Sequence, residues 1–310
     1  MKTYDTAADF AVRLAGLTLE HPIMNGAGVC KGEELPELLN SAAGAIVIGS
    51  ITKEGRLGND GTTYWSNGQA SINSLGLPNA GATFYQEHLG TMVDEAHAAG
   101  KPLFLSIAGF TPDEYAELYE LGGQAGVDLV EANLGCPNVW EGREQKRIAS
   151  FDPEAIDRVL RAITALGWDA SELPLALKVS PYSDPSLLAE VAAVVKQHSV
   201  VRVLTTMNTF PNAYAVDEVG TARITAAGGF GGYAGPAIKP IGIGQVRQWR
   251  AHLPDRIQII GVGGVSTGRD VRDYVEAGAS AVQVVTAYCQ HGRRVFERIL
   301  SEYVTLVAPN

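Results

Sequence analysis

From residue 175 to residue 195 the chain reads Leu175-Ala-Leu-Lys-Val-Ser-Pro-Tyr-Ser-Asp-Pro-Ser-Leu-Leu-Ala-Glu-Val-Ala-Ala-Val-Val195. Leu175–Ser180 is an apolar run with a single lysine, which is typical of a parallel strand buried on both faces. Asp184 then precedes a proline, as at the capped start of a helix. The apolar residues of Leu187–Val195 recur on one helical face. A strand that leads directly into a capped helix predicts one βα unit.

Similar apolar or β-branched runs recur along the whole chain. Eight segments have this character: Pro22–Gly28, Gly44–Ser50, Pro102–Ala108, Val127–Asn133, Leu175–Ser180, Val201–Thr206, Ile257–Val262 and Ala281–Thr286. Between them, Thr111-Pro112, Asp152-Pro153 and Asp184-Pro185 each place a capping side chain before a proline, and Thr267-Gly-Arg-Asp270 fits a capping box. Eight strands alternating with helices predict a single (β/α)8 TIM barrel domain over residues 1–310, with a six-stranded open sheet as the alternative.

Two segments interrupt the alternation of strands and helices. Thr52–Asn79 is polar and glycine-rich, and Phe210–Pro240 carries Gly228-Gly-Phe-Gly-Gly232. Each follows a predicted strand, so in a barrel both lie at the C-terminal face, where active sites are built. Because both contain apolar or aromatic residues, we expect inserted loops anchored to the barrel rather than linkers between domains.

Composition narrows the range of partners. Of 310 residues, 46% are hydrophobic and 19% charged, and the net charge is −10 without a basic cluster. These features disfavour nucleic acid and anionic membranes. The three cysteines are far apart and odd in number, which indicates free thiols in a reducing compartment. Met1–Asp9 has no apolar signal region and no run approaches the ~18 apolar residues of a membrane span, so we expect a soluble, cytoplasmic protein.

Polar residues gather just beyond the predicted strands, whose ends converge on one mouth of a barrel. They are Asn25, Ser106, Asn133, Cys136, Asn138, Lys178, Asn208 and Thr209. Amides can read the edges of a flat heterocycle, and a lysine can stabilise a ring that becomes anionic. The six histidines are scattered and no cluster has metal-ligand spacing, so no metal site is predicted.

Cys136 differs from the other cysteines because it lies between two amides, in Asn133-Leu-Gly-Cys-Pro-Asn138. Pro137 fixes its own φ and biases Cys136 away from the helical region, so the chain turns there. Such a thiol can face a pocket, or it can be a small packed side chain, since free cysteines are often buried. The remaining two are interpreted as packing thiols: Cys30 and Cys289.

Lys178 and the glycines near the C-terminus indicate a charged ligand. Lys178 lies in an apolar run, so it can snorkel, pair with a carboxylate, or form a Schiff base, and a functional role is favoured. Gly261-Val-Gly-Gly264 closes the seventh predicted strand, and Thr286-Ala287 ends the eighth. Backbone N–H groups at this position bind phosphate in many barrels. Together with the amides, this pattern favours flavin mononucleotide (FMN).

These motifs resemble those of the dihydroorotate dehydrogenase family, in particular its soluble class 1 type and the class 1A subgroup. The resemblance covers nearly the whole chain and rests on Met24-Asn-Gly-Ala-Gly28, Ser71-Ile-Asn-Ser-Leu-Gly-Leu-Pro-Asn79, Ser106-Ile-Ala-Gly109, Asn133-Leu-Gly-Cys-Pro-Asn138, Leu177-Lys178, Gly231–Pro240, Ile260-Gly-Val-Gly-Gly264 and Val285-Thr-Ala287. It implies an FMN-binding barrel that oxidises dihydroorotate to orotate in pyrimidine biosynthesis. It also implies a soluble electron acceptor such as fumarate, and a homodimer.

Carried over position by position, the resemblance makes Cys136 the general base, which takes a proton from C5 of dihydroorotate while hydride passes from C6 to flavin N5. Lys178 would stabilise the reduced flavin. Substrate contacts are implied at Asn73, Leu75, Gly76, Leu77, Asn133, Asn138, Asn208 and Thr209. Cofactor contacts are implied at Gly26, Ala27, Gly28, Ser50, Ser106, Asn133, Lys178, Gly235, Gly263, Gly264, Thr286 and Ala287.

One position departs from the class 1 pattern. Gly49 stands where class 1 members carry a lysine that touches the flavin and the substrate carboxylate. Class 2 members carry the equivalent lysine in the preceding loop, where this chain has Lys31. We therefore expect Lys31 to replace the missing charge and to bind the substrate.

Several alternatives stay open on the sequence alone. Without a lysine at the carboxylate, the substrate would be another dihydropyrimidine. From a different class, a lyase or isomerase of phosphorylated metabolites would use Lys178 as a Schiff base. Asn73 and Asn208 are also compatible with simple turn residues. The charged run Glu141–Arg147 is expected to be a solvated lid, from which an arginine can reach the substrate.

Overall fold

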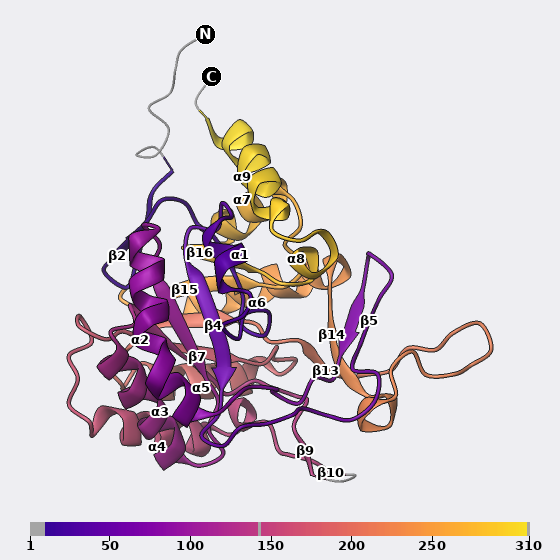
Figure 1. Ribbon diagram of the computed structural model, residues 1–310, viewed down its shortest axis with the longest axis horizontal. Helices are drawn as coiled ribbons and strands as arrows, with labels where there is room; N and C mark the ends of the chain where they lie inside the picture. The colour runs from indigo at the N-terminus through magenta and orange to yellow at the C-terminus, as the bar shows by residue number, and fades with distance from the viewer. Residues whose placement is uncertain (1–9, 142–143, 309–310) are drawn as a thin grey trace.

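Eight parallel strands form the central sheet of the protein (Figure 1). The computed structural model describes residues 10–141 and 144–308. Met1–Asp9, the segment from which the cytoplasmic location was partly expected, lies outside the described residues. In chain order the strands are β3 (Ile23–Asn25), β4 (Ile46–Ile51), β7 (Leu103–Ile107), β8 (Leu129–Asn133), β11 (Leu175–Val179), β12 (Val201–Thr206), β15 (Gln258–Val262) and β16 (Ala281–Val284). Each falls on one of the eight predicted segments.

The sheet curls into a ring, because consecutive strands pair and the last strand, β16, returns to pair with the first, β3. This order confirms the predicted TIM barrel and excludes the six-stranded open sheet. Within the described chain β3 and β4 share no ladder, but the Asn25 side chain joins them. Its Nδ2 donates to Val47 O at 2.8 Å and its Oδ1 accepts from Val47 N at 2.9 Å. Asn25, which we expected at the mouth, instead closes the barrel by imitating a peptide group.

Helices surround the barrel (Figure 1). They are α1 (Leu35–Leu39), α2 (Ala82–Ala98), α3 (Pro112–Ala125), α4 (Pro153–Thr164), α5 (Pro185–Val195), α6 (Lys239–His252), α7 (Gly268–Ala277), α8 (Thr286–His291) and α9 (Arg294–Val307), with 3-10 turns at η1 (Ala149–Phe151), η2 (Ala226–Gly229) and η3 (Pro236–Ile238). The predicted caps are present at the starts of α3, α4 and α5, and the capping box at Thr267 begins α7. Among the described residues, no helix combines the length and apolar character needed to span a bilayer.

The interior of the barrel is layered. A hairpin of β1 (Val12–Leu14) and β2 (Leu17–Leu19) joins an apolar layer that includes Met24, Val47, Phe104, Leu129, Ala176, Val203 and Ala281. Side chains two residues apart on a strand point the same way. The next layer toward the C-terminal end therefore comes from residues two positions further on, and it is buried and polar: Ser106, Glu131, Lys178, Thr205 and Gln283.

The two insertions meet in one antiparallel sheet. The first contributes β5 (Tyr64–Ser66) and β6 (Ser71–Asn73), and the second contributes β13 (Phe210–Ala213) and β14 (Gly231–Ala234). β14 pairs with β6, so segments far apart in sequence hold each other beside the barrel, at the right of Figure 1. A smaller hairpin of β9 (Trp140–Glu141) and β10 (Glu144–Gln145) follows β8.

Candidate active site

A cavity of about 500 Å³ opens where the barrel strands meet the insertion sheet. Most predicted site residues line it: Ala27, Gly28, Lys31, Ser50, Asn73, Leu75, Gly76, Leu77, Asn133, Cys136, Asn138, Lys178, Asn208, Thr209, Gly235, Gly263, Gly264, Thr286 and Ala287. Ser106 lies behind Ser50, with 2.8 Å between the two hydroxyl oxygens. Gly26 lies against Val285, whose Cγ2 is 2.6 Å from the place of a Cβ. These two residues support the wall rather than form it.

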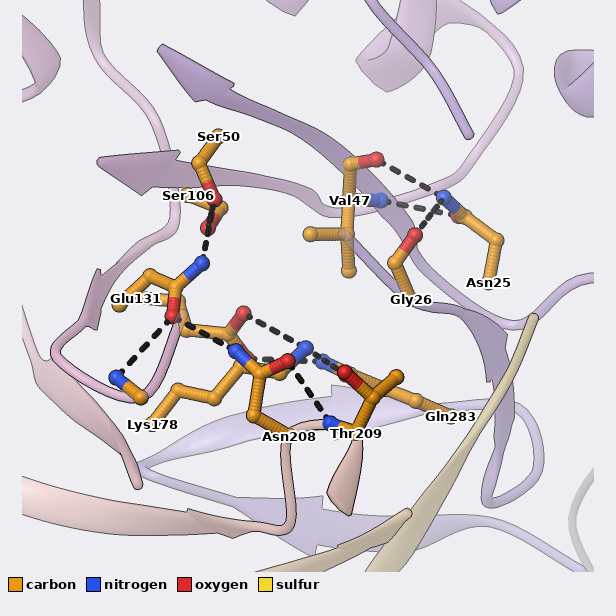
Figure 2. A network of polar contacts seen from close by, with 12 residues as sticks. Asn25, Gly26, Val47, Ser50, Ser106, Glu131, Lys178, Asn208, Thr209 and Gln283 are labelled. Atoms are coloured by element: carbon orange, nitrogen blue, oxygen red, sulfur yellow. Dashed lines mark hydrogen bonds and ion pairs between the residues drawn. The ribbon is translucent and has the colours of Figure 1, made fainter. Parts of the chain in front are cut away.

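Residues from several strand ends form a chain of hydrogen bonds at the cavity (Figure 2). Asn133 Nδ2 donates to Ser50 Oγ at 2.9 Å, and Asn208 Nδ2 donates to Asn133 Oδ1 at 2.9 Å. Asn208 Oδ1 accepts from the backbone N–H of Thr209 at 2.8 Å. The Thr209 hydroxyl is buried without a hydrogen-bond partner and lies against Gly232, where a Cβ would be 1.8 Å from its oxygen. Asn208 thus lines the cavity and is held there by two hydrogen bonds of its amide group.

A second pair of amides comes from the insertion sheet and the Cys136 loop. Asn138 Nδ2 donates to Asn73 Oδ1 at 2.8 Å, and Asn73 Nδ2 donates to Gly232 O at 3.4 Å. Asn59 Nδ2 donates to the backbone carbonyl of Asn138 at 3.1 Å and steadies it from the side. Sequence analysis missed Asn59, because its partner lies in another loop. The paired amides present donors and acceptors to a planar ligand.

The Cys136 thiol is half-buried and lines the cavity. Burial raises its pKa, while the backbone N–H of Asn138 and the positive charges of Lys31, Arg56 and Lys178 oppose that rise. The cations stabilise the thiolate that a base needs, and the buried setting makes that thiolate more basic. The surroundings therefore suit proton abstraction.

The other two cysteines differ from each other. Cys30 lies in the main core, where burial raises its pKa to about 12, as expected of a packing thiol. Cys289 is exposed on α8 and lines the cavity, so the interpretation of it as a packing thiol is wrong. It reaches the cavity because α8 begins directly after the eighth barrel strand. Across residues 10–141 and 144–308, no group of three or more His, Cys, Asp or Glu side chains is arranged to hold a metal.

Lys31 supplies a positive charge to the cavity, where the sequence predicts one. The side chain is half-buried, and its Nζ donates to Ser50 O at 3.1 Å. Burial lowers the pKa of Lys31 to about 8, and the nearby groups of Cys30, Cys136 and Glu34 oppose that shift. An ammonium with a lowered pKa lacks full compensation for its lost hydration, so it favours an anionic ligand.

Gly49 is held against the loop that carries Lys31. Its N–H donates to Cys30 O at 2.9 Å, and its carbonyl accepts from Gly28 N at 2.7 Å. Gly49 has φ +109°, and a Cβ at this position would lie 2.2 Å from Ser106 O. A lysine does not fit there without a backbone shift, so the cation enters from Lys31 instead.

Pairing with a carboxylate is one of the roles predicted for Lys178, and the structure contains such a partner. Its Nζ lies 3.4 Å from Glu131 Oε1 and donates to Gln283 Oε1 at 3.0 Å, while Gln283 Nε2 donates to Glu131 Oε2 at 2.8 Å (Figure 2). All three side chains are buried. Sequence analysis missed Glu131 and Gln283, although a charged residue inside the apolar run Val127–Asn133 was a usable signal.

Glycines after β15 form a backbone cradle at the cavity. Gly263-Gly264 has φ values of +124° and +72°, a region that favours glycine, and a Cβ on the second residue would lie 2.8 Å from Gly235 O. Behind the cradle, Asp270 accepts from Ser266 N at 2.8 Å and from Lys239 Nζ at 2.5 Å. The loop is therefore fixed with its backbone accessible, as a phosphate site requires.

In the charged run Glu141–Arg147, Glu141 belongs to β9 and Glu144–Gln145 form β10, and Gln145 Nε2 donates to the carbonyl of Pro137, which follows Cys136. Residues 142–143, which include one of its two arginines, lie outside the described residues. Arg147, the other arginine, lies 3.6 Å from Asp152 and does not line the cavity. The described arginine therefore faces α4 and not the ligand site.

Known proteins resemble this chain over almost its full length. A family model described as "Dihydroorotate dehydrogenase" matches residues 9–306. A putative dihydroorotate dehydrogenase A (fumarate) of Streptococcus uberis is 36% identical, covering 94% of this chain and 91% of the relative. The dihydroorotate dehydrogenase (fumarate) of Kluyveromyces lactis is 32% identical, covering 96% and 92%. A ligand-free DHODH from Eimeria tenella has the same fold, with a TM-score of 0.81 at 20% identity, covering 99% of this chain and 89% of that one. The chain belongs to the dihydroorotate dehydrogenase family.

Proposed function

We propose that this chain oxidises dihydroorotate to orotate, with FMN as cofactor, Cys136 as general base and fumarate as electron acceptor. Family membership implies an oxidoreductase with a flavin cofactor, and fumarate appears in the names of the relatives from Streptococcus uberis and Kluyveromyces lactis. The observation that carries the proposal is the gathering of the Cys136 thiol, the Lys31 ammonium and a set of amides around one cavity: Asn73, Asn133, Asn138 and Asn208. This set matches a flat pyrimidine that bears a carboxylate and an acidic C–H bond.

The cavity fits FMN. The cradle at Gly263-Gly264 offers backbone N–H groups to the phosphate, and Thr286 lines the same cavity. Ser50 and Lys178 offer polar groups to the ring system, and Gly28 leaves space beside it, since a Cβ there would meet no atom within 4 Å. When bound, FMN supplies the hydride acceptor, at its N5 atom.

Cys136 carries out the proton step. Its thiolate accepts the proton from C5 of dihydroorotate, and loss of the hydride from C6 leaves the C5=C6 double bond of orotate. The raised pKa of Cys136 makes its thiolate a stronger base. The positive charges of Lys31 and Lys178 oppose that rise and so favour formation of the thiolate. The amides of Asn138 and Asn208 line the same cavity as Cys136 and offer hydrogen-bonding groups to the edge of the pyrimidine.

Lys31 binds the substrate carboxylate in place of the lysine absent at position 49. The incoming carboxylate compensates the lost hydration of the Lys31 ammonium, which Glu34 and the nearby thiols compensate only in part. We also propose a cytoplasmic homodimer with one barrel domain over residues 1–310. These statements rest on the family resemblance and on the free thiols, with the described barrel in support.

The two alternatives have weaker support. A dihydropyrimidine without a carboxylate would leave the lost hydration of the Lys31 ammonium only partly compensated, by Glu34 and the nearby thiols. A Schiff-base lyase or isomerase needs a free amine at Lys178, but that nitrogen is held by Gln283 and Glu131.

The test is spectroscopic. Under anaerobic conditions dihydroorotate should bleach the flavin of the purified yellow protein, and fumarate should restore the colour faster than NAD or a quinone. Cys136→Ala should keep FMN but fail to bleach, whereas Cys289→Ala, which removes another cavity thiol, should bleach normally. A colourless protein would overturn the cofactor, and bleaching of Cys136→Ala would overturn the base. Bleaching only by a dihydropyrimidine without a carboxylate would favour that alternative substrate.

A further inference from the structure

The proposed proton transfer does not use Glu131, although this residue is buried at the centre of the barrel. Glu131, Lys178 and Gln283 lie in the polar inner layer, above the apolar layer of Leu129, Ala176 and Ala281. Lys178 and Gln283 line the cavity, whereas Glu131 does not. Glu131 therefore reaches a ligand only through its two partners.

Contacts of Glu131 define how Lys178 is held. One carboxylate oxygen accepts from Gln283, and the other lies 3.4 Å from Lys178 Nζ, buried and without a hydrogen bond. Gln283 Oε1 accepts from the same Nζ at 3.0 Å. A lysine ammonium has three protons to donate. The two contacts inside the barrel direct at most two of them, which leaves one for a ligand in the cavity.

We propose that Glu131, with Gln283, is a positioning residue that keeps Lys178 as a cation facing the flavin and so sets how readily the bound flavin is reduced. This inference rests on the proposed function, because it requires a flavin in the cavity. The Glu131 carboxylate is the counter-charge beside this buried lysine. The same carboxylate weakens the attraction between Lys178 and a reduced, negatively charged flavin. Glu131 thus holds the cation in place and moderates its strength.

Few other charges in the described chain face Lys178. β8 contributes Glu131, and the loop after β8 contributes Cys136, whose thiolate Lys178 stabilises. β12 contributes Thr205, which is beside Lys178 in the ladder and is uncharged, and β16 contributes the neutral Gln283. Because the Cys136 thiol lines the same cavity, each measurement is repeated with Cys136→Ala, which removes the charge of its thiolate.

The experiment measures the midpoint potential of FMN bound to the full chain, by equilibrium reduction against a reference dye at one fixed pH. Glu131→Gln removes a negative charge beside Lys178, so it should raise the ratio of reduced to oxidised flavin at a fixed potential by about tenfold or more, which is about 30 mV for two electrons.

Three further variants isolate the cause. Glu154→Gln removes the same charge from the exposed face of α4 and should leave the potential unchanged. Gln283→Glu adds a carboxylate beside Lys178 and should lower the ratio of reduced to oxidised flavin. The double variant Glu131→Gln/Gln283→Glu should lie between the two single variants.

The outcomes separate this inference from the proposed function. If Glu131→Gln binds FMN with the midpoint potential of the parent, Glu131 is merely structural and the inference is overturned. If Glu131→Gln does not fold, Gln283→Glu decides, and an unchanged or raised ratio overturns the inference. A parent protein that binds no flavin would instead overturn the proposed function.

Discussion

Replacing Lys31 with methionine tests whether this lysine carries the charge that class 1 members place at the position of Gly49. A hydrogen bond to a charged partner contributes about 1.5–3 kcal/mol, and about 1.4 kcal/mol is a factor of ten in binding. In Lys31→Met the KM for dihydroorotate and the Kd for orotate should therefore rise roughly 10- to 150-fold. The melting temperature should not fall appreciably, because methionine has a similar volume and removes a poorly compensated charge.

The pH dependence of orotate binding gives a second measurement on the same residue. Burial lowers the pKa of Lys31 to about 8, so the free protein carries this cation below that pH and loses it above. Since a carboxylate binds the cation, the affinity for orotate should be highest below about pH 8 and should decline as the pH rises through that value. Lys31→Met should show no such decline. Titration of the flavin absorbance with orotate measures Kd without any proton transfer to Cys136.

Lys53→Met is the matched control. Lys53 is exposed, pairs with Glu117 at 2.6 Å and does not line the cavity, so its loss should change neither KM nor the pH profile. An unchanged KM in Lys31→Met, or an orotate affinity that still declines above about pH 8 in that variant, would refute the assignment. The substrate would then be a dihydropyrimidine that does not need this charge.

Two further substitutions test the frame that holds the site. Asn25→Leu leaves the N–H and C=O of Val47 without partners. The free energy of unfolding in urea should therefore fall by about 1–3 kcal/mol for each group. Unchanged stability would mean that the seam between β3 and β4 does not depend on Asn25. Gly49→Ala should destabilise the protein by about 1–3 kcal/mol more than Gly68→Ala, because Gly68 has a similar positive φ but open space around its Cβ, whereas the Cβ at 49 overlaps Ser106 O. Equal losses in the two alanine variants would contradict the role of that overlap.

The barrel could be predicted because its signals are local. The buried strands read as short apolar runs, and Asp152 and Asp184 each mark a helix start next to a proline. The insertion sheet could not be predicted in the same way. Its strands β6 and β14 pair across a long stretch of sequence, and Gly231–Ala234 has no alternating apolar pattern. Pairing of that kind depends on where the barrel brings the two loops.

The cavity wall was predictable because parallel strands bring their C-terminal ends together. This rule gives the end of a strand but not the direction of each side chain. Asn25 ends β3 and yet points sideways, toward Val47 across the seam. Glu131 was missed for a related reason. A carboxylate in an apolar strand has a clear role only once Lys178 and Gln283 are known to occupy the same inner layer.

The presence of a lysine at position 31 and its absence at position 49 can be understood from how the loop after β3 packs against β4. The loop after β3 binds Gly49 through two backbone hydrogen bonds, and Gly49 adopts a positive φ with no room for a Cβ against Ser106 O. The same close approach lets Lys31 reach the carbonyl of Ser50, beside the cavity. The backbone around Gly49 therefore has no room for a side chain, while the loop after β3 supplies Lys31. Because Lys31 lines this wall of the cavity, the absence of a lysine at position 49 is no argument against a carboxylate in the substrate.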